Sequence, residues 1–296
     1  MKLSIITINY NNREGLLKTI KSIIAQTYRD FEYIIIDGGS TDGSVDVIKE
    51  YSEYIDYWVS EPDKGIYNAM NKGVQVAHGD YCQFLNSGDW LYSSTSIENI
   101  LPLLNGSYDI ISSYTNIIDH GHIKRLKSGS PYELTLIGLI NRSLSHPSSF
   151  IKRDVLIEYP YDDSLKIVAD WKFFIEAYIN KMQFCHVDLD IAFFDTSGIS
   201  SSNHELLMIE RTKVLNEIPI SEILNESSVF PSETILLYES ITESITLKKV
   251  LHLVIKFIVS IYSKILFVNI FRKRKIYNSI NYPGKVLNGD RIIFEK

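Results

Sequence analysis

Carboxylate and amide side chains follow two short apolar runs in the N-terminal third of this 296-residue chain. Asp37 comes directly after Tyr33–Ile36, while Asn86 and, three residues later, Asp89 follow Tyr81–Leu85. Mg²⁺ and Mn²⁺ prefer oxygen ligands of this kind and accept phosphate oxygens and water in their remaining positions. These residues therefore predict a site that holds a divalent cation together with a nucleotide diphosphate.

The elements that must position these residues alternate along the chain. Such a βαβαβαβ order predicts an α/β fold with a mainly parallel sheet and right-handed crossovers. Strands are predicted at Leu3–Ile8, Tyr33–Ile36, Tyr57–Ser60 and Tyr81–Leu85. Helices are predicted at about Arg13–Gln26, from a cap at Ser40, Thr41 or Asp42 to about Tyr51, and at Ile66–Ala77. Because ligands bind outside the carboxyl ends of parallel strands, the side chains after these strands are predicted to share one rim.

Several other classes of site lack their sequence signals. The chain has no phosphate-binding loop of the G-x-x-x-x-G-K-[ST] type and no G-x-G-x-x-G turn. The turn at 9–12 has no Gly-rich basic sequence, which argues against a nucleotidyltransferase. Cys82 and Cys185 lie in apolar runs without a CxxC or CxxH neighbour, so we expect buried free thiols rather than a disulfide or a zinc site.

Four sequence blocks resemble the family 2 glycosyltransferases, in the right order and at the right spacing. The nearest branch is that of bacterial polysaccharide-assembly enzymes of the colanic acid and O-antigen type. The resemblance covers about residues 1–205, and its blocks are Ser4–Thr7 with Tyr10 and Asn11, Asp37–Ser44, Glu61–Tyr67 and Asn86–Asp89. It implies a GT-A fold with helices on both faces of a nucleotide-binding sheet, a nucleotide-sugar donor, a divalent cation and inversion at the anomeric carbon.

The resemblance also implies roles for single residues on the donor side. Tyr10 and Asp37 are expected to contact the nucleotide base and its surroundings. Asp63 and Lys64, in a Pro-Asp-Lys-Gly turn, are expected near the base or the diphosphate.

The segment Asn86–Asp89 occupies the place of the family's DxD motif. Asp89 is expected to bind Mn²⁺ or Mg²⁺ that bridges the diphosphate. Asn86 departs from the family pattern because it replaces the first carboxylate, so one negative charge at the cation is missing.

The family places its general base at the start of a helix, and Asp170 matches that place, although the usual Glu-Asp pair is here Ala169-Asp170. A carboxylate at a helix N-terminus stays ionised beside the positive end of the helix dipole and can take a proton from an acceptor hydroxyl. His146, before Pro147, is a further candidate on the acceptor side.

Each assignment has a purely structural alternative. Asp170 could be only a helix cap, and Asp89 only a turn residue. Asp37 could cap the loop that follows it, Asp63 could belong to a plain β-turn, and Lys64 could be a solvated side chain. His146 could equally be a loop histidine with satisfied hydrogen bonds.

The C-terminal part differs in charge from the rest. Nine Lys or Arg and no Asp or Glu lie between Ile245 and Gly289, although the whole chain carries a net charge of −6. Leu247–Asn269 reads as a basic amphipathic helix, which favours an anionic membrane surface; packing on the protein or in a homo-oligomer is the alternative. No aromatic-basic motif indicates nucleic acid.

We predict a catalytic domain at 1–205, a helical linker at 206–246 and a membrane-associating tail at 247–296.

The sequence thus predicts an inverting, metal-dependent transferase of the hexosyltransferase type. Its partners are expected to be a nucleotide-diphosphate sugar and a glycan acceptor, lipid-linked, at the inner face of the cytoplasmic membrane. Because Asn86 replaces a carboxylate, a degenerate nucleotide-sugar-binding or scaffold subunit of a synthase complex is the alternative.

Overall fold

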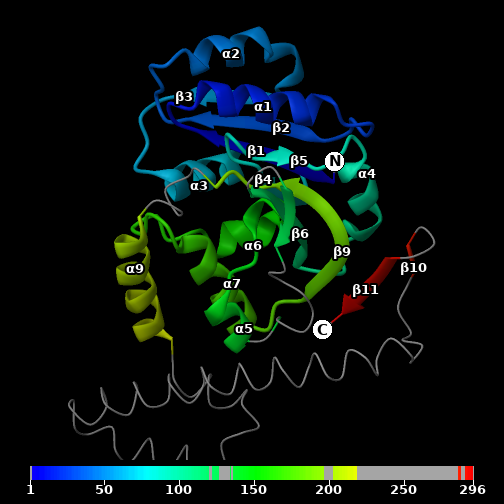
Figure 1. The fold of residues 1–296 in the computed structure, drawn as a ribbon, viewed down its shortest axis with the longest axis vertical. Helices are drawn as coiled ribbons and strands as arrows, with labels where there is room; N and C mark the ends of the chain where they lie inside the picture. The colour runs from blue at the N-terminus through cyan, green and yellow to red at the C-terminus, as the bar shows by residue number, and fades with distance from the viewer. Residues whose placement is uncertain are drawn as a thin grey trace, which may run out of the picture.

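The computed structural model describes residues 2–119, 122–126, 134, 136–196, 203–218, 286–287 and 291–295. Its described strands form a single mixed sheet in the order β10-β11-β9-β6-β8-β4-β1-β2-β3, with β5 paired to β9 and β7 paired to β6 (Figure 1). The predicted α/β class is therefore confirmed, with an all-parallel N-terminal half and a second half of mixed parallel and antiparallel pairing.

The N-terminal half is the parallel part. It comprises β1 (Leu3–Asn9), β2 (Glu32–Asp37), β3 (Tyr57–Ser60) and β4 (Tyr81–Phe84), which pair in parallel in the order β3-β2-β1-β4. Every residue of β1, β2 and β4 is buried, as the apolar runs predict for strands covered on both faces. The loops after β1, β2 and β4 consequently open on the same edge.

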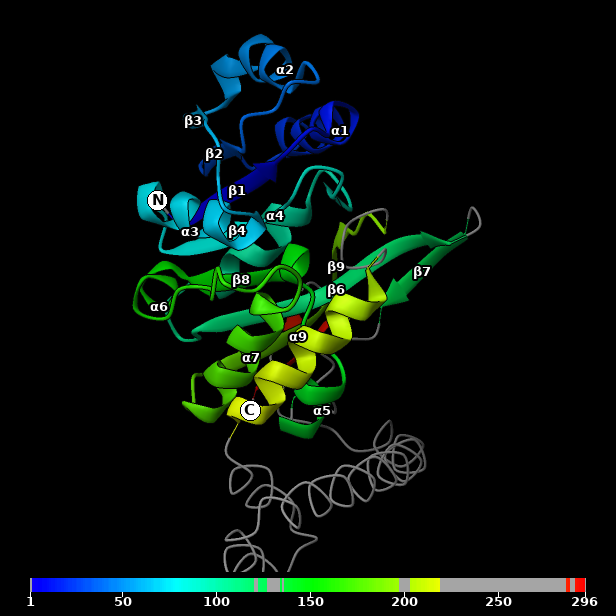
Figure 2. The same cartoon turned by 90° about the vertical axis from the view of Figure 1, so that its left-hand side faces the viewer.

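The second half continues the sheet with mixed pairing. Its strands are β5 (Trp90–Leu91), β6 (Ile110–Asp119), β7 (His122–Leu126), β8 (Ser149–Lys152), β9 (Phe184–Phe193), β10 (Val286–Leu287) and β11 (Arg291–Glu295). β8 runs antiparallel to β4 and β6, whereas β6 and β9 are parallel and shift register around Tyr114. The β6–β7 hairpin extends away from the body of the sheet (Figure 2).

Helices cover both faces, as predicted. They are α1 (Arg13–Ile24), α2 (Ser44–Glu50), α3 (Ile66–Val76), α4 (Ser96–Ile100), α5 (Leu136–Asn141), α6 (Arg153–Glu158), α7 (Ala169–Ile179) and α9 (His204–Glu217), with 3₁₀ turns at Ser52–Tyr54, Leu101–Leu103 and His146–Ser148. Successive strand residues point to opposite faces, so each face has its own core. Ile6 and Ile34 pack with α3 and α7, whereas Ile5 and Ile35 pack with α1 and α2.

Cys82 and Cys185 are buried thiols that form no disulfide, as expected. α9 packs on the body that carries the sheet, where Glu210 is buried and accepts hydrogen bonds from the backbone N–H groups of Lys166 and Ile167. The described beginning of the 206–246 region therefore belongs to the same core as α7.

The predicted amphipathic segment Leu247–Asn269 lies outside the described residues. Within the described part of the chain, no helix has the length and apolar character needed to cross a bilayer.

Candidate active site

A cavity of about 970 Å³ opens at the carboxyl ends of β1 and β4. The N-terminal turns of α3 and α7, the 3₁₀ turn at His146 and the segment after β9 complete its walls. Its lining includes six of the residues that the sequence singled out: Tyr10, Asp63, Asn86, Asp89, His146 and Asp170.

Asp89 lies in a tight turn that α1 holds from behind. Gly88 has a left-handed backbone (φ +104), and the Thr19 hydroxyl donates to the Asp89 carbonyl oxygen (2.6 Å) while it accepts from Gly88 N–H (3.1 Å). The Asp89 side chain is 4% exposed, and its Oδ1 accepts a hydrogen bond from Asp195 N–H at 2.8 Å. Its Oδ2 has no hydrogen-bond partner. Burial raises the pKa of Asp89, although His146 partly offsets this effect.

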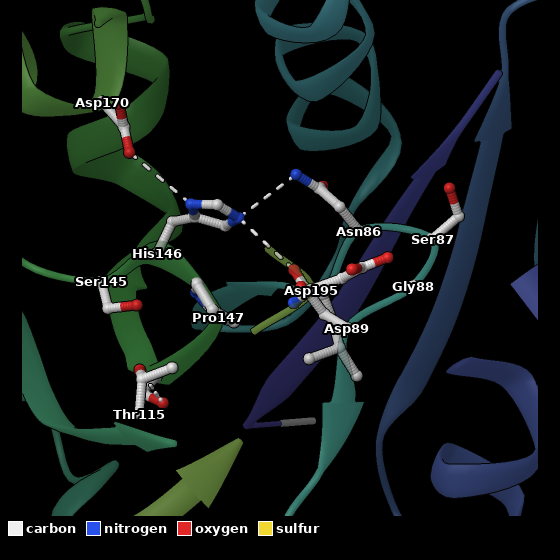
Figure 3. Close-up of polar contacts among 12 residues, drawn as sticks. Asn86, Ser87, Gly88, Asp89, Thr115, Ser145, His146, Pro147, Asp170 and Asp195 are labelled. Atoms are coloured by element: carbon white, nitrogen blue, oxygen red, sulfur yellow. Dashed lines mark hydrogen bonds and ion pairs between the residues drawn. The ribbon is translucent and has the colours of Figure 1, made fainter. Parts of the chain in front are cut away.

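His146 lies between two of the predicted functional carboxylates (Figure 3). Its Nε2 is 3.6 Å from Asp89 Oδ2, and its Nδ1 is 3.5 Å from Asp170 Oδ2. The Asn86 amide nitrogen lies 3.2 Å from the same Nε2. Burial alone would lower the pKa of His146, but the two carboxylates outweigh it and raise the pKa to about 9.

The backbone that carries His146 is fixed from below by polar side chains of the sheet. Gln83 of β4 donates to the Pro147 carbonyl oxygen at 2.8 Å, and Ser113 of β6 donates to the Ser148 carbonyl oxygen at 2.9 Å. Thr115, the next residue of β6 on the same face, donates to the Ser148 hydroxyl at 2.6 Å. Buried polar groups that are paired in this way hold one conformation, so the ring position is set by the sheet.

Asp170 is in the first turn of α7, as the sequence predicts. Its Oδ1 accepts from Trp171 N–H at 2.9 Å and lies 2.9 Å from the Tyr67 hydroxyl, which is also 2.6 Å from the Ile167 carbonyl oxygen. Tyr67 and the helix start thus fix one carboxylate oxygen, and the other oxygen faces His146.

Asp37 ends β2 on the expected edge, but its side chain does not line the cavity. It is fully buried, and its two oxygens accept from Asn9 Nδ2, Ser40 Oγ, Ser60 Oγ and the backbone N–H groups of Gly39 and Ser40. Burial alone would raise its pKa, but these hydrogen bonds hold the pKa below its usual range. The side chain therefore ties β1, β2 and β3 together, and its expected contact with the nucleotide stays a prediction.

Tyr10 and Asp63 face the cavity around Gly38. A Cβ on Gly38 would lie 2.7 Å from Asp63 Oδ2 and 3.1 Å from Tyr10 Cδ2, so glycine lets the three residues pack closely. Tyr10 is 66% exposed, which leaves its ring open to a ligand. Asp63 Oδ1 accepts from Gly65 N–H at 2.7 Å and so shapes the turn before α3.

Lys64 does not line the cavity, whereas Lys166 does. Lys166 Nζ donates to the Lys64 carbonyl oxygen at 2.7 Å, so a loop a hundred residues further along the chain brings a second ammonium group to this wall. The expected role of Lys64 near the diphosphate stays a prediction. Sequence reasoning also missed Asp195, which lines the cavity two residues after the end of β9. The signal for Asp195 was present, because it follows a strand in the same way as Asp37 and Asp89 do.

Acidic groups outnumber basic ones among the described lining residues. Four carboxylates, from Asp63, Asp89, Asp170 and Asp195, face Lys166 and His146. A nucleotide diphosphate is itself anionic, so a further cation would offset the repulsion between it and these carboxylates.

Two buried oxygens, Asp89 Oδ2 and Asn86 Oδ1, have no hydrogen-bond partner beside this acidic surface. They are the type of ligand that Mg²⁺ and Mn²⁺ bind, so the residues present fit such an ion. The described part of the chain contains no group of three or more His, Cys, Asp or Glu arranged for a metal, so substrate oxygens and water must supply further ligands.

Comparison with known proteins identifies the relatives of this chain. The sequence model of Glycosyl transferase family 2 matches residues 4–159. An uncharacterized glycosyltransferase of Mycobacterium tuberculosis is 31% identical over 202 residues, which are 67% of this chain and 77% of the relative. A PGL/p-HBAD biosynthesis glycosyltransferase of the same species is 28% identical over 181 residues, or 60% of this chain and 70% of the relative.

Solved structures show the same fold. S. aureus TarS 1–349 in complex with UDP-GlcNAc superposes with a TM-score of 0.62 at 19% identity, over 77% of this chain and 68% of that one. The complex of TarS 1–349 with UDP gives 0.58 at 17% identity, over 98% and 96% of the two chains. At these identities the likeness concerns the GT-A-like arrangement of the sheet and helices.

Proposed function

Because the chain belongs to Glycosyl transferase family 2, we propose that it moves one sugar from a nucleotide-diphosphate donor to a hydroxyl group of a glycan acceptor, with inversion at the anomeric carbon. One observation carries the proposal. The buried Asp89 and the helix-start Asp170 face each other across one cavity, with His146 between them.

The donor lies along the rim formed by the ends of β1, β2 and β4. Tyr10 offers an exposed ring to the nucleotide base, and Asp63 and Gly38 shape the wall beneath it. Lys166 faces the diphosphate from the opposite wall, in the role that the sequence had given to Lys64. A nucleotide diphosphate at a crevice beside the carboxyl ends of parallel strands follows the general rule for α/β sheets.

Asp89 would hold a divalent cation, Mn²⁺ or Mg²⁺, with Asn86 beside it. When bound, such an ion acts as a Lewis acid on the diphosphate and stabilises negative charge on the leaving group. The buried Asp89 Oδ2, which accepts no hydrogen bond, supports this role, because a group of this kind costs folding free energy unless a ligand satisfies it.

Asp170 acts as the general base. It accepts the proton of the acceptor hydroxyl while that oxygen forms a bond to the anomeric carbon and the bond from this carbon to the diphosphate oxygen breaks. Tyr67 and Trp171 N–H hold Oδ1, so the carboxylate keeps a fixed direction toward the cavity. A base placed in this way contributes about 10² to about 10⁴ in rate.

The acceptor is proposed to be a lipid-linked glycan of a surface polysaccharide, and the enzyme to be peripheral at the inner membrane face. The basic amphipathic pattern of Leu247–Asn269 supports the membrane part of this proposal. The four sequence blocks support the colanic acid and O-antigen type of pathway. Full-length protein should bind vesicles that contain anionic lipids and should not bind vesicles of neutral lipids. Equal binding to anionic and neutral vesicles would count against the proposed location at the membrane.

The test of the proposed function is turnover of a donor panel by the purified full-length chain. UDP-glucose, UDP-galactose, UDP-N-acetylglucosamine and GDP-mannose are incubated with Mn²⁺, and release of the nucleotide diphosphate is measured. We expect one donor to be consumed, and Asp170→Asn to bind that donor but not consume it. A protein that binds a donor and never turns it over would instead be the degenerate scaffold subunit that the Asn86 replacement suggests. His78→Gln, a surface change away from the cavity, is the control variant.

A further inference from the structure

Two buried oxygens in the turn after β4 have no hydrogen-bond partner, and one of them, Asp89 Oδ2, lies 3.6 Å from His146 Nε2 as an ion pair. The Asp89 side chain is 4% exposed, and neither its Oδ2 nor Asn86 Oδ1 accepts a hydrogen bond. Leaving a buried polar atom unpaired costs about 1 to 3 kcal/mol, so such atoms call for an explanation in a ligand. Asp37, at the end of the neighbouring β2, shows by contrast a carboxylate that the fold satisfies completely.

His146 places a ring nitrogen next to these oxygens. Its Nε2 lies 3.6 Å from Asp89 Oδ2 and 3.2 Å from the Asn86 amide nitrogen. Two ligand atoms about 2.1 Å from one metal lie between about 3.0 Å apart, at a right angle, and about 4.2 Å apart, on opposite sides. The separation of Nε2 and Oδ2 falls inside this interval, so one ion can reach both atoms without a large movement.

The other ring nitrogen faces a carboxylate. Nδ1 of His146 lies 3.5 Å from Asp170 Oδ2 (Figure 3). Histidines that bind metals generally present their second ring nitrogen to a carboxylate or carbonyl, which fixes the orientation of the ring. The sheet also fixes the backbone that follows His146, because Gln83 and Ser113 donate to the carbonyl oxygens of Pro147 and Ser148. The ring therefore has the support that is typical of a metal ligand.

We propose, resting on the sugar transfer proposed above, that His146 is a direct ligand of the divalent cation. Its Nε2 and Asp89 Oδ2 form the protein part of the site, and Asp170 orients the imidazole from the far side. His146 thereby supplies the ligand that the chain lost when Asn86 took the place of a carboxylate. The remaining positions are left to diphosphate oxygens and water, in line with the small number of protein ligands.

A nitrogen ligand changes which metal the site prefers. Imidazole binds first-row transition metals more strongly than it binds Mg²⁺, whereas carboxylate and water suit Mg²⁺ well. The site should therefore bind Mn²⁺ and Co²⁺ in preference to Mg²⁺. His146→Asp, which restores an oxygen ligand, should reduce the ratio of Mn²⁺ to Mg²⁺ affinity, and His146→Gln should weaken Mn²⁺ binding by at least about tenfold.

The direct test is pulsed electron paramagnetic resonance of Mn²⁺ bound to the full-length protein with UDP, and with GDP in parallel. Coordination by an imidazole gives a nitrogen modulation of the Mn²⁺ echo. We expect this modulation in the wild type and in His78→Gln, and its loss in His146→Gln, whose fold is checked by circular dichroism. Asp170→Asn should keep the modulation but bind Mn²⁺ about 10- to 100-fold more weakly, as expected when a group that orients a metal-binding histidine is lost.

The outcomes separate this inference from the function on which it rests. Mn²⁺ that binds without nitrogen modulation, or with modulation that persists in His146→Gln, overturns the ligand role even when the donor panel shows turnover. The absence of bound Mn²⁺ with either nucleotide overturns it as well. Nitrogen-coordinated Mn²⁺ in a protein that consumes no sugar donor would leave the metal site standing and remove the transferase proposal.

Discussion

The ends of β2 and β4 carry two buried carboxylates with opposite environments. Asp37 is fully buried, and the groups around it donate to its two oxygens, so its pKa is held below the usual range. Asp89 is 3% exposed, keeps one oxygen without a hydrogen-bond partner, and has its pKa raised by burial. The two side chains belong to the same edge of the same sheet and resemble each other in sequence context.

We interpret Asp37 as a structural carboxylate and Asp89 as the carboxylate that binds the proposed cation. The hydrogen bonds of Asp37 join the loops after β1, β2 and β3, so its charge is used within the fold. Burial disfavours the charge of Asp89, and the proposed cation would stabilise this charge when it binds. Binding sites often retain such locally unfavourable groups at the expense of stability.

The largest effect is expected from Asp89→Asn. The change removes the carboxylate that is proposed to hold the cation, so kcat/KM should fall by at least about 10³, the equivalent of several kcal/mol of lost Lewis-acid assistance. Because burial favours the uncharged form of Asp89, the same variant should melt at a higher temperature than the wild type without metal. Donor turnover and thermal unfolding measure the two results; a variant that is less stable and fully active would reverse the comparison.

Asp170→Asn is expected to act on the chemical step. An amide cannot accept the hydroxyl proton, so kcat should fall by about 10² to about 10³. At Mn²⁺ concentrations that saturate the variant as well as the wild type, the donor dissociation constant should stay within about threefold of the wild-type value. Asn can still accept the hydrogen bond from Trp171 N–H, so the helix start should remain intact. Steady-state kinetics with the donor found in the panel, beside equilibrium titration, provide the measurement. Loss of donor binding and activity together would indicate a structural role.

Asp37→Asn is the matched change on the structural side. The amide loses acceptor capacity toward Asn9, Ser40 and Ser60, and a hydrogen bond to a charged group is worth about 1.5 to 3 kcal/mol. The free energy of unfolding should therefore fall by about 2 kcal/mol, while kcat changes by less than about tenfold. Urea unfolding and donor turnover check these values. A stable variant with no turnover would place Asp37 in the chemistry after all.

The dependence of stability on pH should differ in sign between the two carboxylates. The lowered pKa of Asp37 contributes stability above its unfolded pKa of about 3.9, and this contribution is lost as the pH falls through the folded pKa. The raised pKa of Asp89 means that the fold loses stability as the pH rises through the folded pKa. Melting curves without metal should show the deficit of Asp37→Asn shrinking toward low pH, and the gain of Asp89→Asn growing toward neutral pH. Parallel curves for the two variants would contradict the comparison.

The sequence predicted the position of the site better than it predicted the contacts of each side chain. Strand ends can be read from apolar runs, and the sheet edge follows from their order, so Tyr10, Asp63 and Asp89 were expected on one rim and line the cavity. The direction of the Asp37 side chain depends on hydroxyl groups of Ser40 and Ser60, which no local pattern reveals.

The sequence also did not predict the contacts between segments that are distant along the chain. Lys166 replaces Lys64 at the cavity because the loop before α7 folds back onto the start of α3. His146 was expected only on the acceptor side, and its position between Asp89 and Asp170 requires three segments of the chain to converge. Such convergence is set by tertiary packing, and periodicity within one element does not encode it.

Nucleotide affinity with and without Mn²⁺ tests the central claim most directly. Titrations of UDP and GDP into the wild type, Asp89→Asn and Asp37→Asn compare the two strand ends in one experiment. We expect Mn²⁺ to tighten binding of one nucleotide by at least about tenfold in the wild type and in Asp37→Asn, and to have no effect in Asp89→Asn. If Mn²⁺ still tightens nucleotide binding in Asp89→Asn, the assignment of Asp89 as a ligand of the cation is contradicted.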